Sequence, residues 1–349
     1  MENQSVSGRL SSLHNRITDV PGLAVGNFAS DVLRSGVTVV MFDRPAATGC
    51  AIFGGAPGSR ETSLLEPEML VDAVDALVLS GGSGFGLDAA SGVQAYLREQ
   101  GRGFPVGPIR IPIVPQAILF DLNNGGDKDW GRYPPYREMG FAAASAAAQD
   151  FSLGSAGAGV GATTPHVRGG LGSASARTSG GFTVGVLAAV NALGSPLVGE
   201  GPHFWAAPWE IGNEFGGLGL PASITPEMRG LSWKGGPSLA TTLIIVATDA
   251  ILTKAEAKRI AIVSHGGIAR ALRLSAAAQD GDTVFAASTG VKPLGDAHRD
   301  NLTEIGAVAA DCVARAIARG VYLADANELP VGPPAWRQRF AKSGDLSAR

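Results

Sequence analysis

The chain has 349 residues, of which 45% are hydrophobic and 17% are charged, so it can build a large core and is unlike a disordered protein. Its 28 basic and 31 acidic residues give a net charge of −3 without a basic stripe, which argues against binding to nucleic acid or an anionic membrane. Residues 1–16 form a polar leader that lacks the apolar core of a signal peptide. We therefore expect a cytoplasmic protein.

Short strand-like runs dominate the first part of the chain. They span residues 22–28, 36–42, 49–55 and 74–80. A helix is expected over residues 84–101, ending at Gly101. The following extended segment carries Pro112 and Pro115, which restrict it to an edge or irregular strand. After a loop over 124–139, the alanine content predicts a helix over 140–150.

The middle of the chain predicts a hairpin followed by a long irregular segment. Residues 172–178 and 182–192 read as two strands joined through Gly180 and Gly181. Residues 195–237 are rich in Gly, Pro and Trp and show little periodicity. Such long segments are usually functional or disordered.

The last third alternates strands and helices. After the apolar strand that begins at Thr241, Thr253 and Glu256 have the spacing of a capping box at the start of a helix. A strand over 280–289 and a helix over 301–320 follow, with Asn301 as the expected N-cap and Gly320 as the expected stop. Residues 324–349 are predicted to form a C-terminal arm.

One candidate chemistry is nucleotide binding. Gly84, Gly86 and Ala89 fit the G-x-G-x-x-A pattern, after a strand and at the opening of a helix. No acidic residue ends a following strand about twenty residues on, where a ribose partner should lie. A tight strand-to-helix turn explains the glycines equally well, and a nucleotide-cofactor-binding α/β protein stays open as an alternative.

Metal chemistry finds little support. No two of the five histidines lie three or four residues apart; they are His14, His166, His203, His265 and His298. Asp280 and Asp282 could begin a calcium loop, but the twelfth position is Val291 rather than glutamate. Cys50 and Cys312 make no zinc or disulfide pattern and are predicted to be core thiols. We expect no metal and no cofactor.

Two threonines stand at the start of the apolar strand, and Thr241 raises a third chemistry. A threonine hydroxyl is a weak nucleophile, but a free α-amino group on the same residue can act as its base. An internal threonine gains that amine only if the bond from Ala240 to Thr241 is cut. Threonine is also common in strands, so this position alone allows both interpretations.

Several ordered motifs resemble the autoprocessing aminopeptidases typified by DmpA. This family includes the L-aminopeptidase/D-esterases, the β-peptidyl aminopeptidases and the nylon-oligomer endohydrolase. The motifs are GGAPGSRETSLL (54–65), LSGGSGFGLDAASGV (79–93), IPIVPQAILFDL (111–122), GSAGAGVGAT (154–163), VGVLAAVNALG (184–194), TTLIIVATDAILTKAEAKRIA (241–261) and DGDTVFAASTG (280–290). Their order and length make the resemblance specific.

The resemblance implies roles for individual residues. Thr241 looks like the nucleophile at the start of a small subunit, and Asn191 matches an asparagine that helps to bind the oxyanion. Asp280 and Asp282 match a pair that orients the nucleophile's hydroxyl and amine. From the sequence alone, Asn191 could equally end a strand at a turn, and the two aspartates could form a solvated Asp-Gly turn.

The chain also departs from the family's pattern. Gln116 stands near a glutamate that grips the substrate ammonium in some members, and Phe120 or Ile118 stands near a tyrosine. His166, or Arg168, takes the position of a lysine after the glycine-rich loop. We expect Gln116, Phe120 and His166 to contribute to the substrate pocket. The departures leave strict recognition of a free N-terminal amine open.

The resemblance implies a single α+β domain over residues 1–349, a four-layer αββα sandwich of the kind found in N-terminal-nucleophile hydrolases. It implies cleavage between Ala240 and Thr241 into subunits 1–240 and 241–349, and a homo-oligomer, with a tetramer favoured. The expected activity is hydrolysis of short peptides, amino-acid amides or related linear amides through an acyl-enzyme. An unprocessed, non-catalytic relative is the remaining alternative.

Overall fold

A computed structural model describes residues 13–235, 240–325 and 331–340. Its strands are β1 (Leu23–Ser30), β2 (Ser35–Ile52), β3 (Ser59–Arg60), β4 (Val74–Ser80), β5 (Phe104–Val106), β6 (Ile109–Ile111), β7 (Gln116–Ile118), β8 (Gly170–Arg177), β9 (Thr183–Asn191), β10 (Thr241–Ala250) and β11 (Thr283–Lys292). Its helices are α1 (Ser83–Gly86), α2 (Ala89–Glu99), α3 (Tyr136–Ser145), α4 (Lys254–Ala271), α5 (His298–Tyr322) and α6 (Trp336–Phe340).

The long strand β2 belongs to two sheets. Residues 37–41 pair with β4, while residues 47–52 pair with β11, so the strand passes from one sheet into the next. The first sheet runs β3-β7-β4-β2, with β1 on the other side of β2. The second runs β2-β11-β10-β9-β8, and among its described strands β10 and β11 pair in parallel while the other neighbours are antiparallel.

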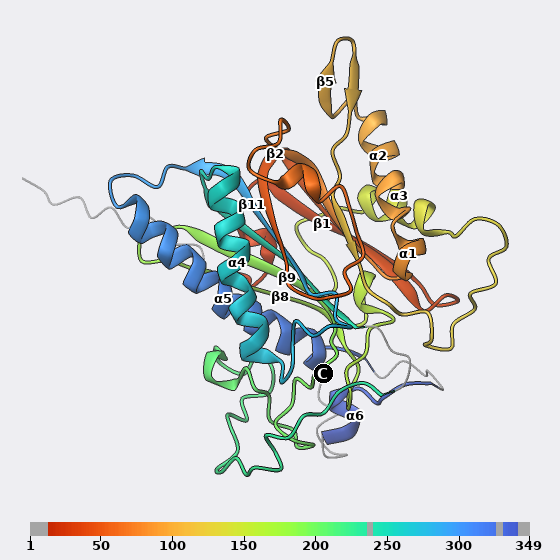
Figure 1. The fold of residues 1–349 in the computed structure, drawn as a ribbon, viewed down its shortest axis with the longest axis vertical. Coiled ribbons are helices and arrows are strands. Elements are labelled where there is room, and N and C mark those ends of the chain that lie inside the picture. Colours follow the sequence, from red (N-terminus) through yellow and green to blue (C-terminus); the bar gives the residue numbers. More distant parts are fainter. Residues whose placement is uncertain (1–12, 236–239, 326–330, 341–349) are drawn as a thin grey trace, which may run out of the picture.

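Helices cover the outer face of each sheet, so the chain forms four layers. Figure 1 shows α4 and α5 on one side and α2 and α3 on the other. Along β10, Leu243 and Ile245 pack between the sheets, while Ile244 and Val246 pack toward α4 and α5. This alternation buries both faces of the strand, as a central strand of a sandwich requires. The predicted αββα sandwich is confirmed.

Several predicted elements are confirmed closely. Strand β4 spans the predicted 74–80, and β8 and β9 form the predicted antiparallel hairpin. The capping box at the start of α4 is complete, because the Thr253 hydroxyl accepts from the Glu256 amide and the Glu256 carboxylate accepts from the Thr253 amide. Cys50 and Cys312 are buried, and burial raises the pKa of each thiol to about 12.

The helix predicted over 84–101 is broken into α1 and α2. Gln116 lies across the break: its side-chain amide donates to the Gly86 carbonyl at 2.6 Å, and its oxygen accepts from the Ala90 amide at 3.0 Å. These bonds satisfy backbone groups that a continuous helix would have paired internally. The two strands predicted over 36–42 and 49–55 are the single strand β2.

The predicted helix boundaries are wrong at three places. Helix α3 begins at Tyr136, inside the predicted loop, because this ring is fully buried and its hydroxyl donates to Ser35 at 3.1 Å. Asn301 lies inside α5, where its side chain donates to the Leu294 carbonyl. Gly320 does not end α5 either. A Cβ there would lie within 2.9 Å of the Gly172 nitrogen in β8, so the glycine permits close helix–sheet packing.

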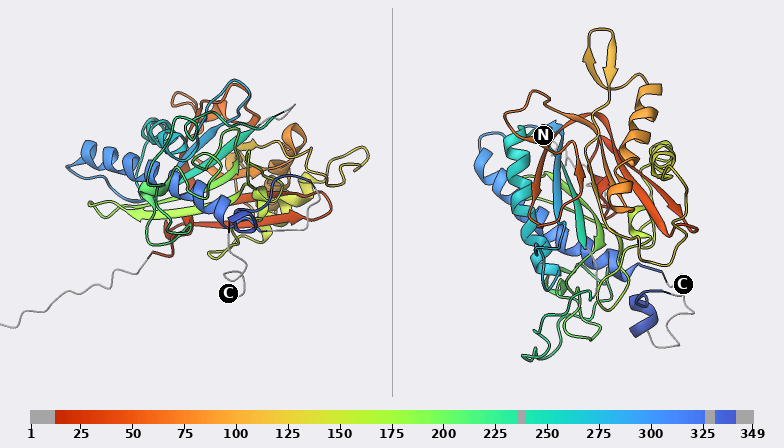
Figure 2. Two further views of the ribbon diagram at one scale, coloured as in Figure 1. Left: turned by 90° about the horizontal axis from the view of Figure 1, so that it is seen from below. Right: turned by 45° about the vertical axis from the view of Figure 1, so that its right-hand side comes forward.

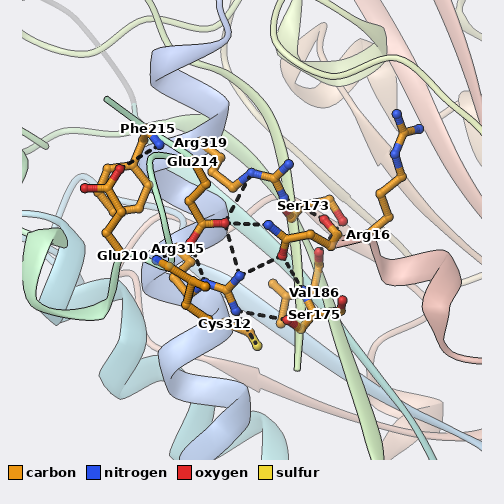
Figure 3. Close-up of polar contacts among 12 residues, drawn as sticks. Arg16, Ser173, Ser175, Val186, Glu210, Glu214, Phe215, Cys312, Arg315 and Arg319 are labelled. Carbon is orange, nitrogen blue, oxygen red and sulfur yellow. Dashed lines mark hydrogen bonds and ion pairs between the residues drawn. The ribbon is translucent and has the colours of Figure 1, made fainter. Parts of the chain in front are cut away.

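Side-chain contacts tie the irregular segment and the C-terminal arm to the body of the fold. In the irregular segment after β9, Glu214 lies between Arg315 and Arg319 of α5 (Figure 3). The described part of the predicted C-terminal arm carries α6, whose Trp336 is buried and stacks on Phe204 at a ring-centroid distance of 5.9 Å. Residues 326–330 and 341–349 of that arm lie outside the described residues.

Figure 2 shows the β5–β6 hairpin projecting from the body.

In the parts of the chain that the structure describes, no helix is both long enough and apolar enough to cross a membrane.

Candidate active site

The end of β9, the start of β10 and the loop before β11 meet in one buried place. Asn191, the last residue of β9, is the ladder partner of Thr241, the first residue of β10. Ala240 forms a parallel bridge with Asp280. The four predicted catalytic residues Thr241, Asn191, Asp280 and Asp282 are all at most 4% exposed. The sheet register therefore gathers residues that lie far apart in the sequence.

Two donors converge on the carbonyl oxygen of Ala240. The Thr241 hydroxyl donates to it at 2.6 Å, and the backbone N–H of Gly281 donates to it at 2.8 Å. A Cβ at position 281 would lie 2.5 Å from the Thr241 hydroxyl oxygen, so the close approach requires glycine. The Gly281 N–H therefore polarises the Ala240 carbonyl, while the Thr241 hydroxyl is held beside it.

The two aspartates differ in their bonding. Asp282 is satisfied by backbone donors: one oxygen accepts from the Thr242 amide at 2.8 Å and the other from the Ala276 amide at 2.9 Å. Asp280 has a buried Oδ1 without a hydrogen-bond partner among the described residues. Burial, reinforced by the charge and hydrogen bond of Asp282, raises the pKa of Asp280 to about 8. Asp282 is thus held in place by its two backbone donors. Asp280 keeps an oxygen free of such bonds and changes its protonation state near neutral pH.

Asn191 is held at both ends of its carboxamide. Its side-chain oxygen accepts from the Thr163 amide at 3.0 Å and from the Lys234 ammonium at 2.7 Å, while its NH₂ donates to the Phe120 carbonyl at 2.9 Å. Two donors on one atom define which end is oxygen. Among the described residues only the Phe120 carbonyl accepts from this NH₂, so its second N–H remains for another acceptor.

Lys234 is partly buried at this place and also donates to the Asn191 backbone carbonyl at 3.1 Å. Burial lowers the pKa of its ammonium to about 7, although the negative charges of Asp280 and Asp121 oppose the shift. Beside it lies a cavity of about 130 Å³, whose lining includes Phe120, Asp121 and Thr163. Among the described residues, no three potential metal-ligating side chains of His, Cys, Asp or Glu are grouped together.

Comparison with known families decides what kind of protein carries this arrangement. The family model of peptidase family S58 matches residues 15–331, which is most of the chain. The chain belongs to peptidase family S58. The resemblance seen in the sequence motifs is thereby confirmed, and the protein is a hydrolase of peptide bonds.

Relatives of this S58 peptidase match along nearly their whole length. An uncharacterized aminopeptidase of Mycobacterium tuberculosis is 40% identical over 354 aligned positions, which cover 93% of this chain and 98% of the relative. The β-aminopeptidase of Burkholderia sp. has a similar structure, with a TM-score of 0.70 at 20% identity, covering 94% of this chain and 92% of its own.

A second solved structure supports the fold assignment. The L-aminopeptidase D-Ala-esterase/amidase of Ochrobactrum anthropi, described as a variant of the Ntn hydrolase fold, has a TM-score of 0.65 at 20% identity. The match covers 89% of this chain and 86% of that chain. The predicted Ntn-hydrolase-like layering of this S58 peptidase is confirmed.

The three residues expected near the substrate lie in different surroundings. Phe120 lines the cavity beside Lys234, and its carbonyl binds Asn191. Gln116 is fully buried in the break between α1 and α2 and is absent from the residues that line this cavity. His166 contacts the hydroxyl of Ser232 at 2.7 Å, and Ser232 lies two residues before Lys234 in the chain. The structure therefore brings Phe120 to the site, and His166 only to the segment that leads there.

One glycine of the nucleotide-like motif, Gly86, serves packing in this S58 peptidase. A Cβ on Gly86 would lie 1.8 Å from the Gly81 carbonyl oxygen, whereas one on Gly84 would meet open space. The helix that they open, α1, has only four residues. The strand-to-helix turn explains the pattern, and it contains Gly86 because the backbone passes so close.

Sequence reasoning missed Lys234 and Gly281. Lys234 lies at the end of the irregular segment, where no periodicity indicates which side chains turn inward. The only available signal was a lone lysine seven positions before Thr241. Gly281 acts through its backbone N–H and its missing side chain, and the Asp-Gly-Asp pattern reads equally well as a turn.

Proposed function

We propose that this chain is a precursor that cuts itself between Ala240 and Thr241, and that Thr241 then serves as the N-terminal nucleophile of an amide hydrolase. The observation that carries the proposal is the geometry at Ala240. Its carbonyl oxygen accepts from the Thr241 hydroxyl at 2.6 Å and from the Gly281 N–H at 2.8 Å. A hydroxyl beside a polarised carbonyl is the arrangement that acyl transfer requires.

The self-cleavage has two steps. The Thr241 oxygen adds to the Ala240 carbonyl carbon, the C–N bond breaks, and the hydroxyl proton ends on the new amine of Thr241. This leaves an ester between Ala240 and the Thr241 oxygen. Water then hydrolyses the ester, which yields the Ala240 carboxylate and restores the hydroxyl. The buried, well-ordered register of β9 and β10 supports this assignment, because it fixes the nucleophile on a rigid strand.

In the mature enzyme the same residues act on a substrate amide. The free amine of Thr241 is the base and then the acid, and the remaining N–H of Asn191 binds the oxyanion. Asp280 and Asp282 orient the hydroxyl and amine. The aminopeptidase names of the mycobacterial and Burkholderia relatives favour short peptides or amino-acid amides as substrates. The family resemblance favours a homo-tetramer of cleaved pairs.

The intact mass of the purified protein under denaturing conditions tests this proposal. We expect two fragments, residues 1–240 and 241–349, with Thr241 as the first residue of the smaller one. Amide hydrolysis should appear together with the fragments. One full-length chain that persists for days at neutral pH would contradict self-cleavage.

Gly281→Ala should slow self-cleavage by about 100-fold, since a 1 Å misplacement of a reacting group can cost that much. The added methyl would lie 2.5 Å from the Thr241 hydroxyl oxygen and must displace it. Gly266→Ala is the matched control, because a Cβ there meets nothing within 4 Å. Fragment formation is followed on denaturing gels. A Gly281→Ala chain that cleaves at the rate of the control would refute the role of this contact.

The shifted pKa values of Asp280 and Lys234 should also make the unfolding free energy depend on pH. The pKa of Asp280 rises from 3.8 to about 8 on folding, so the folded chain holds a proton there that the unfolded chain releases. Its contribution to the unfolding free energy therefore falls as the pH rises from 4 to 8. For Lys234 the pKa falls from 10.5 to about 7, so its contribution rises with pH between these values.

Urea unfolding of two single-chain variants measures the first effect. Thr241→Ala keeps the chain uncut, and Thr241→Ala/Asp280→Asn removes the acid in the same background. The single variant should lose more stability than the double variant as the pH rises from about 4 to 8. Parallel pH curves for the two variants would contradict the assignment.

A further inference from the structure

The position of Lys234 is set by its backbone. Its N–H donates to the Leu193 carbonyl at 3.1 Å, and its neighbour Trp233 forms an antiparallel bridge with Gly194. The Ser232 hydroxyl contacts His166 at 2.7 Å. This short stretch therefore runs beside the chain that leaves β9, and it directs the lysine side chain back onto the last residue of that strand.

The ammonium of Lys234 is built into the site rather than resting on its surface. It donates to both the backbone carbonyl and the side-chain oxygen of Asn191, at 3.1 and 2.7 Å. The charged groups that face it are Asp280, in the loop before β11, and Asp121, which follows β7. Asp280 interacts in turn with Asp282, and Asp282 with His265. The two acceptor oxygens of Asn191 bind the ammonium form of Lys234, and negative charge on Asp280 or Asp121 favours that form further.

The effect on Asn191 is specific. With Lys234 and the Thr163 amide both donating to its oxygen, the carboxamide cannot rotate without placing NH₂ against two donors. Its NH₂ is thereby kept on the side of Phe120, with one N–H still available. A cation on the amide oxygen also polarises the group, which strengthens that remaining N–H as a donor.

We propose that Lys234 is a positioning residue for the reaction at Thr241: it locks and polarises the Asn191 carboxamide while the Ala240–Thr241 bond is cut. The inference rests on the proposed self-cleavage. Residues 235–240 alone separate Lys234 from the bond. Lys234 thus lies close in sequence to Ala240, which self-cleavage would make the new C-terminus of the large fragment.

The test compares self-cleavage rates of freshly refolded precursors. Lys234→Met and Lys234→Ala should slow fragment formation by up to about 100-fold, as expected for misplacement of a group that assists acyl transfer. Lys254→Met is the matched control. It removes a buried lysine that donates to two backbone carbonyls, those of Leu64 and Met69, in another part of the fold. The control should cleave at the wild-type rate.

Rescue by added amines separates positioning from a general loss of structure. Ethylammonium should restore part of the cleavage rate of Lys234→Ala, because it supplies N–H donors in the vacated space beside the cavity. Tetramethylammonium carries the same charge but no N–H, and should not restore it. Lys234→Met lacks the vacated space and should respond to neither ion.

The outcomes distinguish this inference from the proposed function. If Lys234→Met and Lys234→Ala cleave like the control, Lys234 has no positioning role, while self-cleavage itself stands. Slow cleavage without rescue by ethylammonium, or with equal rescue by tetramethylammonium, also overturns the role as stated. If the wild-type chain forms no fragments at all, the proposed function fails first.

Discussion

Thr241→Ala should remain one chain of 349 residues and should show no amide hydrolysis. The variant lacks the hydroxyl that lies 2.6 Å from the Ala240 oxygen, so no ester can form and no N-terminal nucleophile arises. We expect complete loss of both events, because they use the same atom. Intact mass and hydrolysis of an amino-acid anilide, measured on the same sample, check the expectation.

Two controls make the result specific to this hydroxyl. Thr241→Ser keeps the nucleophilic oxygen and should still form fragments. Thr242→Val removes the next hydroxyl, which is buried and has no hydrogen-bond partner among the described residues, while it keeps the side chain's shape. It should cleave normally and lose no stability. Fragments from Thr241→Ala, or an uncut Thr242→Val chain, would show that another residue is the nucleophile.

Glu214→Gln should be the most destabilising change outside the active site. The Glu214 carboxylate accepts from Arg315 at 2.6 and 3.1 Å and from the Asn15 amide at 2.5 Å, with Arg319 on its other side (Figure 3). Both members of the Glu214–Arg315 pair have side chains at most 8% exposed. Removing one partner of a buried ion pair leaves an uncompensated charge, which costs about 3–5 kcal/mol.

The location of this ion cluster gives the prediction a second readout. Glu214 and Asn15 belong to the predicted fragment 1–240, whereas Arg315 and Arg319 belong to 241–349. The cluster should therefore help to hold the two fragments together after cleavage. Glu214→Gln should lower the urea midpoint of the uncut Thr241→Ala chain, and it should release the fragments from one another at lower urea in the cleaved protein.

A surface pair that joins the same two fragments serves as the control. Lys258 contacts Glu66, and their side chains are 30% and 39% exposed. Glu66→Gln should cost only about 0.2–1 kcal/mol, as exposed ion pairs do. Equal effects of Glu66→Gln and Glu214→Gln would contradict the burial argument. Replacing Glu214 and Arg315 together by methionine should cost less than Glu214→Gln alone.

Acid should weaken the same cluster. Burial favours the protonated form of Glu214, but hydrogen bonds and the positive charge of Arg315 outweigh it and hold the pKa of this carboxyl below 4.5. A lowered pKa in the folded state adds stability above the unfolded value, and this stability is lost as the pH falls through the folded value. Fragment association should therefore weaken below about pH 4.5, and less so in Glu214→Gln.

The sequence by itself determined the parts of this protein that depend on local pattern. Alternating and continuous apolar runs predicted β4, β9 and β10. A buried strand needs apolar side chains at neighbouring positions, so its pattern is visible within a short window of sequence. The capping box of α4 was readable for the same reason, since its two members lie three residues apart. The ordered family motifs indicated the S58 assignment and pointed to Thr241.

The family motifs had already grouped Asn191, Asp280 and Asp282 with Thr241, but only the tertiary structure decided which other residues meet there. Lys234 reaches Asn191 from a segment without periodicity, and Gly281 contributes a backbone N–H that no side-chain pattern encodes. Gln116 has the type of side chain a binding pocket could use, yet it bridges a helix break instead. Glu214 and Arg315 lie about a hundred positions apart. Such contacts depend on how the layers pack and on sheet register, and a sequence read in short windows carries neither.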